Sequence, residues 1–194
     1  MHCLRWARIS SAAAFFSRHA RVAIFAIAFA DKIRLAAIDF DATILDFHTG
    51  GRWKGSATDL IPHIRPEFRC FVSHCLGKGI QVAVATFSTQ TGMIERVMKE
   101  AIPHPRSTEI HVFGGDDYVE GYSKGKQSQL LLAMNSFNDQ EQVKSNGRAR
   151  EPIIPSATIL IDDDTDNIEV ALEDGYKTFA FLPDTPSSFL HMSL

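Results

Sequence analysis

Aspartate residues whose spacing suits phosphate chemistry stand at two places in the sequence. Asp39 and Asp41 are separated by one residue at the end of a short apolar run, and three consecutive aspartates, 162–164, follow another such run. Adjacent carboxylates repel one another at close approach unless a cation offsets their charge. The two groups together therefore indicate a cation site if the fold brings them to one place.

The oxygen atoms of these aspartates suit Mg²⁺. Hard oxygen ligands such as Asp39, the backbone carbonyl of Asp41 and the carboxylate of Asp163 match its preference, and bound Mg²⁺ favours phosphate as a partner. A carboxylate at Asp39 can also accept a phosphoryl group and form an aspartyl-phosphate. Asp41, two residues on, is of the right type to protonate the leaving oxygen and then to activate water.

Two further polar features lie next to predicted elements. Thr86 stands directly after the apolar run 80–85, and Lys124 and Lys126 precede a helical stretch. A threonine hydroxyl and nearby N–H groups can hold phosphoryl oxygens, and a lysine offsets the charge of an acylphosphate and its carboxylates. These residues supply the positioning and charge stabilisation that in-line phosphoryl transfer needs.

The elements that must position these residues alternate between strands and helices. Short apolar runs predict five strands, at residues 34–39, 80–85, 109–113, 157–161 and 177–182. Helical periodicity predicts helices between them, at residues 63–76, 89–101, 123–134 and 167–173. Such alternation is typical of parallel β-α-β units, so we expect a three-layer α/β/α fold with a mainly parallel, Rossmann-like sheet. Ligands in these folds bind beyond the carboxyl ends of the strands, where the polar residues above would meet.

Length and composition indicate one globular domain. The chain has 194 residues, of which 45% are hydrophobic and 22% charged, and its net charge of −3 argues against a broad nucleic-acid-binding face. We assign residues 31–194 to a catalytic domain with a polar loop at 135–156. Glycines within residues 44–58 predict a hairpin flap after the first strand. The short spacings between these polar residues leave little room for an inserted domain over the site, so we expect an open site.

The first thirty residues differ in charge from the rest. They contain four arginines and no acidic residue, so they carry +4 and the remainder carries −7. Three interpretations of residues 1–30 stay open: a cleaved mitochondrial or secretory targeting peptide, a helix that packs on the domain or on a partner, and an extension without a role. The apolar run 22–30 is too short to span a bilayer. We expect a cytoplasmic location, with mitochondrial or secretory targeting by residues 1–30 as the alternative.

The motifs resemble those of the haloacid dehalogenase-like (HAD-like) superfamily. The stretch 39–43 (DFDAT) is similar to its DxDx[TV] motif, Thr86 to its second motif, and 162–167 (DDDTDN) to the DDxxxN form of its magnesium-dependent phosphatases. The resemblance covers about residues 33–182. One departure is Ala42, where many members carry glycine or a polar residue. The resemblance implies a HAD-like fold of the capless, magnesium-dependent phosphatase type.

The resemblance also implies roles for individual residues. Asp39 would be the nucleophile, Asp41 the general acid/base, and Thr86 a phosphate-binding residue. Asp163 would bind the metal directly, and Asp162 would support it from the neighbouring position.

The lysine of the family's third motif has two candidates. Lys126 is the better match, because Leu130 follows it at the spacing expected for a lysine that opens an amphipathic helix. Lys124 remains the alternative, since some members place the lysine before a glycine such as Gly125.

The same resemblance implies phosphate-ester hydrolysis. Members with aspartate at the second position of the first motif are mostly phosphatases or phosphotransferases. We therefore expect Mg²⁺-dependent hydrolysis through an aspartyl-phosphate, acting on a phosphoprotein or a small phosphate ester. The alternative is a catalytically silent HAD-fold protein that binds or regulates partners through its basic N-terminal segment.

Overall fold

A parallel five-stranded sheet forms the centre of the protein. The computed structural model describes residues 33–117, 119–144 and 151–182. The strand order is β3-β2-β1-β4-β5, and every neighbouring pair is parallel. The strands are β1 (Leu35–Ile38), β2 (Gln81–Ala85), β3 (His111–Phe113), β4 (Thr158–Asp162) and β5 (Lys177–Ala180).

The central strands are buried on both faces. β1 pairs with β2 on one side, with Leu35 opposite Gln81, and with β4 on the other, with Leu35 opposite Thr158. All four residues of β1 are inaccessible to solvent. A strand covered on both faces gains from apolar side chains at every position, which is why these segments are continuous apolar runs and do not alternate with polar residues.

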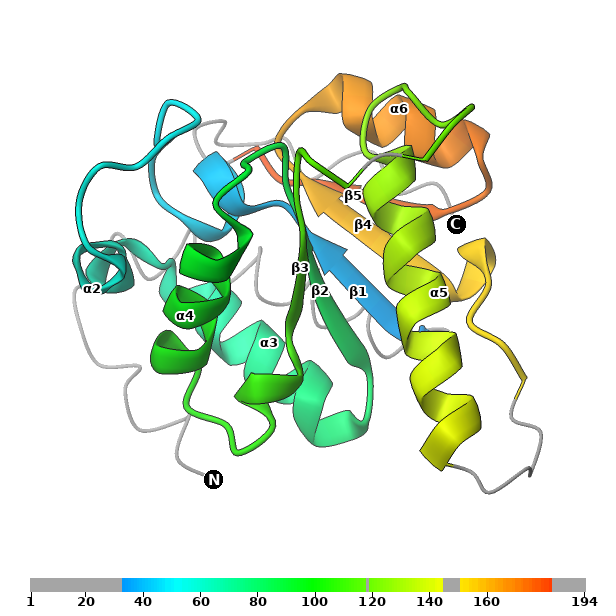
Figure 1. Cartoon of the computed structure of the whole chain (residues 1–194), viewed down its shortest axis with the longest axis horizontal. Helices are drawn as coiled ribbons and strands as arrows, with labels where there is room; N and C mark the ends of the chain where they lie inside the picture. Colours follow the sequence, from blue (N-terminus) through cyan, green and yellow to red (C-terminus); the bar gives the residue numbers. More distant parts are fainter. Residues whose placement is uncertain (1–32, 118, 145–150, 183–194) are drawn as a thin grey trace.

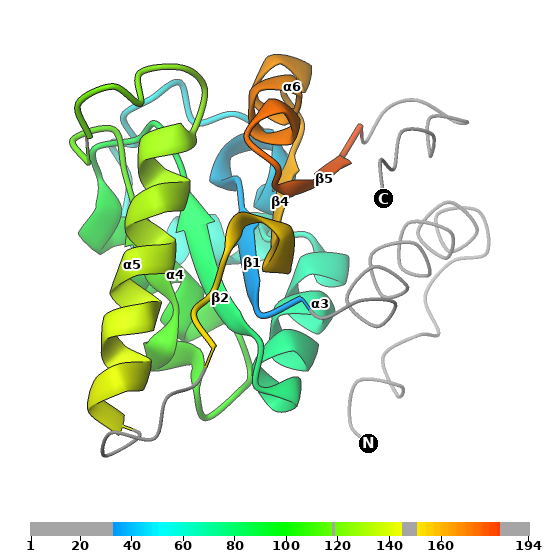
Figure 2. The same cartoon turned by 90° about the vertical axis from the view of Figure 1, so that its right-hand side faces the viewer.

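Helices cover both faces of the sheet and complete three layers, as expected (Figures 1 and 2). One apolar cluster joins one face to α2 (Ala57–Leu60), α3 (Pro66–Lys78) and α4 (Thr91–Ala101). A second cluster joins the opposite face to α5 (Gln127–Lys144) and α6 (Thr165–Glu173).

Residues 44–58 do not form the paired strands of the predicted hairpin flap. Residues 46–56 form a loop without strands, and one antiparallel bridge, between Leu45 and Ile64, closes its base. Gly50 and Gly51 have φ angles of 76° and 89°, so the chain reverses through left-handed backbone that interrupts an extended strand. We call residues 46–56 the site loop, because it borders the cavity described below.

The predicted polar loop at 135–156 is also corrected. Residues 135–144 continue α5 without interruption, and residues 145–150 lie outside the described residues. Tertiary contacts hold this polar half of the helix in place. Asn138 exchanges two hydrogen bonds with the backbone of Ile153, at 3.0 and 2.6 Å, and Glu141 forms an ion pair with Arg34 at 2.5 Å.

The stretches where a cap domain would be inserted are short. Within the described residues, the chain between β1 and β2 forms the site loop, α2, a 3-10 turn and α3, and the chain between β2 and α5 forms α4, a 3-10 turn and β3. None of the helices in the described ranges has the length and apolar character that a bilayer span requires. Residues 1–30 lie outside the described residues, so the three interpretations of that segment stay open.

Candidate active site

The first motif forms a tight turn at the end of β1. Asp39 follows the strand directly, and the five residues Phe40–Ile44 reverse the chain, with the Leu45 N–H donating to the Phe40 carbonyl at 2.9 Å. Within this turn Ala42 has a φ of 58°, a left-handed conformation that costs a residue with a Cβ about 1–2 kcal/mol. This backbone explains why glycine also suits the position, and the turn directs the acidic side chains out of the sheet.

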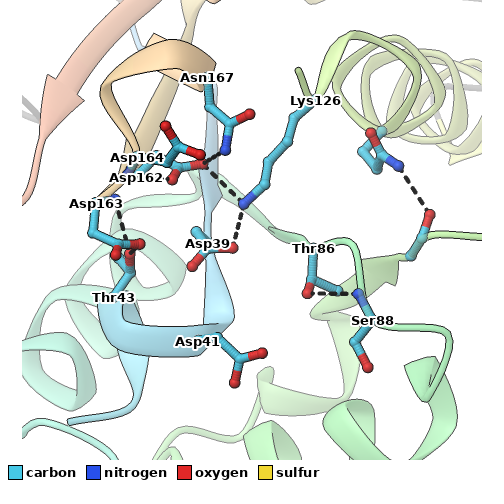
Figure 3. Close-up of polar contacts among 12 residues, drawn as sticks. Asp39, Asp41, Thr43, Thr86, Ser88, Lys126, Asp162, Asp163, Asp164 and Asn167 are labelled. Carbon is cyan, nitrogen blue, oxygen red and sulfur yellow. Dashed lines mark hydrogen bonds and ion pairs between the residues drawn. The ribbon is translucent and has the colours of Figure 1, made fainter. Parts of the chain in front are cut away.

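A buried lysine lies between two of the predicted carboxylates (Figure 3). Lys126 Nζ forms ion pairs with Asp39 Oδ1 and with Asp162 Oδ2, the second at 2.8 Å, and all three side chains are buried. Lys124 is exposed, and its backbone N–H donates to Gln127 Oε1 at 3.4 Å. The structure therefore places Lys126 rather than Lys124 against the aspartates.

Both carboxylate oxygens of Asp162, at the end of β4, have bonding partners. Oδ1 accepts from the Asp164 N–H at 2.9 Å, and Oδ2 accepts from Asn167 Nδ2 at 3.2 Å as well as from Lys126. Gly125 makes room for this arrangement, since a Cβ there would approach Asn167 Oδ1 to 3.3 Å and its φ is 47°. The Asp162 side chain therefore connects β4, α6 and the start of α5.

Asp163 is fixed by Thr43 on the neighbouring turn. Thr43 Oγ1 donates to Asp163 Oδ1 at 2.9 Å and accepts from the Asp163 N–H at 3.1 Å. Because the carboxylate accepts the Thr43 bond on Oδ1, its other oxygen, Oδ2, can take a further ligand. Thr43 thereby couples the turn after β1 to the end of β4.

The Asp41 carboxylate lies apart from the other carboxylates (Figure 3). It contacts the site loop through Thr49. One oxygen accepts from the Thr49 N–H and the other from Thr49 Oγ1, each at 3.0 Å. These two bonds orient the carboxylate while leaving it half-exposed at the cavity. Asp41 is thus positioned differently from Asp39, although only one residue separates them.

Thr86 begins a short polar turn after β2. Its hydroxyl accepts from the Ser88 N–H at 3.1 Å, and Ser88 Oγ accepts from the Gln90 N–H at 3.2 Å. Thr86 and Ser88 are both buried. Since the acceptor role of the Thr86 hydroxyl is filled by Ser88, its own hydrogen remains available to a ligand in the cavity.

Electrostatics distinguish Asp39 from an ordinary carboxylate. Burial raises the pKa of Asp39 to about 7, with Asp162 and Asp163 adding to the effect and Lys126 opposing it. For Lys126, burial alone would lower the pKa of the ammonium, but Asp39 and Asp162 outweigh burial and raise it. The lysine is therefore held in its charged form, and the carboxylates around it outnumber this one positive charge.

Three of the carboxylates are close enough to share a cation. Within the part of the chain that the structure describes, ligand oxygens of Asp39, Asp162 and Asp163 lie within 4.8 Å of one another, and the Asp41 carboxylate is not in this group. One lysine among three carboxylates leaves negative charge that a divalent cation would balance. The all-oxygen donor set fits Mg²⁺.

These residues line one open cavity of about 400 Å³. Its walls come from the ends of β1, β2 and β4, the site loop and the residue before α5, as expected for a parallel α/β sheet. The lining residues are Asp39, Asp41, His48, Gly51, Thr86, Phe87, Ser88, Lys126, Asp162, Asp163, Asp164 and Asn167. All the predicted site residues are therefore at one place.

The sequence interpretation missed residues that hold the site together. Thr43 is the last residue of the stretch 39–43 and Asn167 is the last residue of the stretch 162–167, and both bond to aspartates. Their place in the motifs was a signal that could have assigned these roles. Thr49 carries no such signal, because its contact with Asp41 depends on how the site loop returns.

Comparisons with known proteins add a distant structural likeness. No protein-family model and no curated protein matches the chain. A solved structure with a TM-score of 0.45 and 18% sequence identity is the N-terminal part of the protein BF1531 from Bacteroides fragilis, which contains a phosphatase domain and is complexed with Mg. The match covers 94% of this chain and spans 44% of that one. The parallel sheet and the aspartate cluster agree with the fold and the acidic site that the resemblance of the motifs implies.

Proposed function

We propose that this protein is a Mg²⁺-dependent phosphate-ester hydrolase that acts through an aspartyl-phosphate on Asp39. The observation that carries the proposal is the buried group formed by Asp39, Lys126, Asp162 and Asp163 at the base of an open cavity. A buried lysine among clustered carboxylates is costly to a fold unless it serves a site, and perturbed groups of this kind concentrate where chemistry occurs.

The residues suited to hold the cation are Asp39, Asp163 and the backbone carbonyl of Asp41. Asp163 has Oδ2 available, whereas Asp162 has partners on both oxygens and supports the site by anchoring Lys126 and Asn167. Mg²⁺ bound there would offset the negative charge of Asp39 and of the phosphoryl group, so that one anion can attack another.

Asp39 and Asp41 divide the chemistry between them. A carboxylate oxygen of Asp39 forms a bond to phosphorus while the bond from phosphorus to the ester oxygen breaks, and Asp41 gives that oxygen a proton. Asp41 then takes a proton from water, which attacks phosphorus and releases inorganic phosphate and the Asp39 carboxylate. The contacts of Asp41 with Thr49 keep it at the cavity and away from the carboxylates around Lys126.

Lys126 and Thr86 stabilise the charge that moves during transfer. Lys126 contacts the Asp39 oxygen directly and would balance the acylphosphate formed there. The Thr86 hydroxyl, already accepting from Ser88, would donate to a phosphoryl oxygen. The openness of the cavity suits a phosphorylated substrate, either a phosphoprotein or a small phosphate ester.

The test is turnover of phosphate esters by the full chain with Mg²⁺ and with a chelator. We expect Mg²⁺-dependent release of phosphate and a loss of at least about a thousandfold in Asp39→Asn, because the nucleophile is removed. Asp116→Asn, an exposed change of the same kind after β3, is the matched control and should keep full activity. The wild type and Asp116→Asn should also bind aluminium fluoride with Mg²⁺, and Asp39→Asn should not.

If purified protein shows no Mg²⁺-dependent turnover and Asp39→Asn binds the fluoride complex as well as the wild type, the hydrolase proposal is wrong. A catalytically silent HAD-fold binding protein would then be the better description.

A further inference from the structure

Phe87 is an exposed aromatic side chain in the wall of the candidate active site. Its side chain is 56% exposed, and it lines the cavity between Thr86 and Ser88, both of which are buried. Phe87 belongs to neither of the two apolar clusters that cover the sheet faces in the described residues. A phenyl ring that contributes nothing to either cluster, at the mouth of a polar cavity, is placed to contact whatever enters it.

The backbone under this ring is rigidly held. The Thr86 N–H donates to the Phe113 carbonyl at 3.0 Å, and the Gly115 N–H donates to the Ser88 carbonyl at 3.1 Å. The packing is so close that a Cβ on Gly115 would approach the Phe87 carbonyl oxygen to 2.2 Å. The ring is therefore carried by a fixed turn rather than by a mobile loop, and a ligand would not have to order it.

The face of the ring is turned toward the reacting groups. Lys126 Nζ lies over the Phe87 ring, 5.4 Å from its centre, and the same ammonium contacts Asp39. The Phe87 ring and the Asp39 carboxylate therefore both neighbour the same ammonium, so a phosphoryl group on Asp39 would be attached on the side of the cavity where the ring lies. A group attached next to the ester oxygen would therefore reach the ring, whereas a long linker would carry its far end past the ring.

Deepening the function proposed above, on which it rests, we propose that Phe87 determines specificity for phosphate esters whose leaving group carries an aromatic ring at or next to the ester oxygen. The ring of such a substrate packs against Phe87 in an offset or edge-to-face arrangement, which aromatic pairs favour. Nucleoside monophosphates, whose base is separated from phosphate by a sugar, place the aromatic ring beyond this position.

The test compares benzyl phosphate with cyclohexylmethyl phosphate, which have similar size and similar leaving alcohols but differ in aromaticity. For the wild type we expect kcat/KM to favour benzyl phosphate by about three- to tenfold. Phe87→Leu should remove that preference, because it lowers kcat/KM for benzyl phosphate more than kcat/KM for the cyclohexylmethyl ester. Phe87→Tyr should retain the preference, because it retains the ring.

Tyr122→Leu is the matched control, because Tyr122 is also an exposed aromatic residue, at 42%, and does not line the cavity. It should leave both rates unchanged. Equal rates for the two esters in the wild type, or an equal loss for both in Phe87→Leu, would overturn the role of Phe87 while the hydrolase proposal stands. If Phe87→Leu lowered kcat/KM for adenosine monophosphate more than kcat/KM for benzyl phosphate, the restriction to short linkers would be overturned.

Binding of two non-hydrolysable phosphonates, measured with Mg²⁺ by calorimetry, separates this inference from the proposed function. Benzylphosphonate should bind about three- to tenfold tighter than cyclohexylmethylphosphonate, and Phe87→Leu should abolish the difference. If that pattern appears without turnover of any ester, Phe87 still recognises aromatic ligands and the hydrolase proposal is wrong. If neither turnover nor a binding preference appears, both are wrong.

Discussion

Lys126 is the residue on which the charge balance of the site depends. Its ammonium is buried and contacts Asp39 and Asp162, which lie at the ends of different strands. Removing one partner of a buried ionic group leaves the remaining charges uncompensated, which costs more than the group contributes when intact.

We expect Lys126→Met to lower the free energy of unfolding by about 3–5 kcal/mol in the absence of Mg²⁺. Urea unfolding in the presence of a chelator measures this change. Lys124→Met, an exposed substitution two residues earlier, should change it by less than about 0.5 kcal/mol. Equal effects of the two substitutions would contradict the placement of Lys126 in the site.

Cys75 gives a second residue-level prediction, concerning alkaline pH. Burial in α3 raises the pKa of its thiol from 9.0 to about 12. Between these values the unfolded chain loses a proton that the folded chain keeps, so stability falls as pH rises above about 9, by up to about 1.4 kcal/mol per pH unit. In Cys75→Ala this contribution should vanish, making the fall in unfolding free energy between pH 8 and pH 10.5 shallower than in the wild type. Parallel pH profiles would refute the assignment.

At the scale of elements, a reciprocal pair of hydrogen bonds ties the site loop to α4. The Trp53 N–H donates to Gln90 Oε1 at 2.7 Å, and Gln90 Nε2 donates to the Trp53 carbonyl at 3.1 Å. The Gln90 N–H in turn bonds to Ser88 in the turn that carries Thr86. The loop that holds Asp41 and the turn that begins at Thr86 are therefore parts of one connected unit.

Gln90→Leu should loosen this unit without disturbing the core. Loss of both bonds, each contributing about 0.5–1.5 kcal/mol, should speed hydrogen exchange of the Trp53 amide by about tenfold or more. Glu95→Gln, an exposed change on the next turn of α4, serves as the control and should leave that exchange rate unaltered. Unchanged protection of the site loop in Gln90→Leu would show that other contacts hold it.

How far the sequence predicts these elements depends on what stabilises each of them. The strands were predictable because β1, β2 and β4 are apolar at nearly every position, a local pattern with a single structural explanation. The second half of α5 was not predictable from the sequence, because its residues are mostly polar. Asn138 and Glu141 hold this part of the helix through partners that are distant in the chain. The structure of the site loop was not predictable for the same reason, because Thr49 and Trp53 bond to partners that lie near them only in the folded protein.

At the scale of the whole molecule, cation binding should couple to stability. A cation bound by the folded protein and not by the unfolded chain stabilises it by about 2.7 kcal/mol at a hundredfold excess over the dissociation constant. For a protein of this size that corresponds to a rise in melting temperature of about 5–10 °C on adding Mg²⁺. Thermal unfolding followed by circular dichroism, with Mg²⁺ and with a chelator, measures the rise.

Asp163→Asn should abolish most of that rise, because it removes charge from the carboxylate with an available oxygen. Asp166→Asn, an exposed substitution in the first turn of α6, should retain it. A full Mg²⁺-dependent rise in Asp163→Asn would exclude this carboxylate as a principal ligand.

The position of β1 at the centre of the sheet has a consequence for biosynthesis. β1 is made before both of its neighbours, and β4, which supplies Asp162 to the site, follows only after α5 has left the ribosome. One apolar edge of β1 therefore stays unpaired until β4 has been made, a state in which nascent chains are prone to aggregate. The buried carboxylates cannot meet until β4 has joined the sheet, so the growing chain acquires its cation site only after this last central strand has been made.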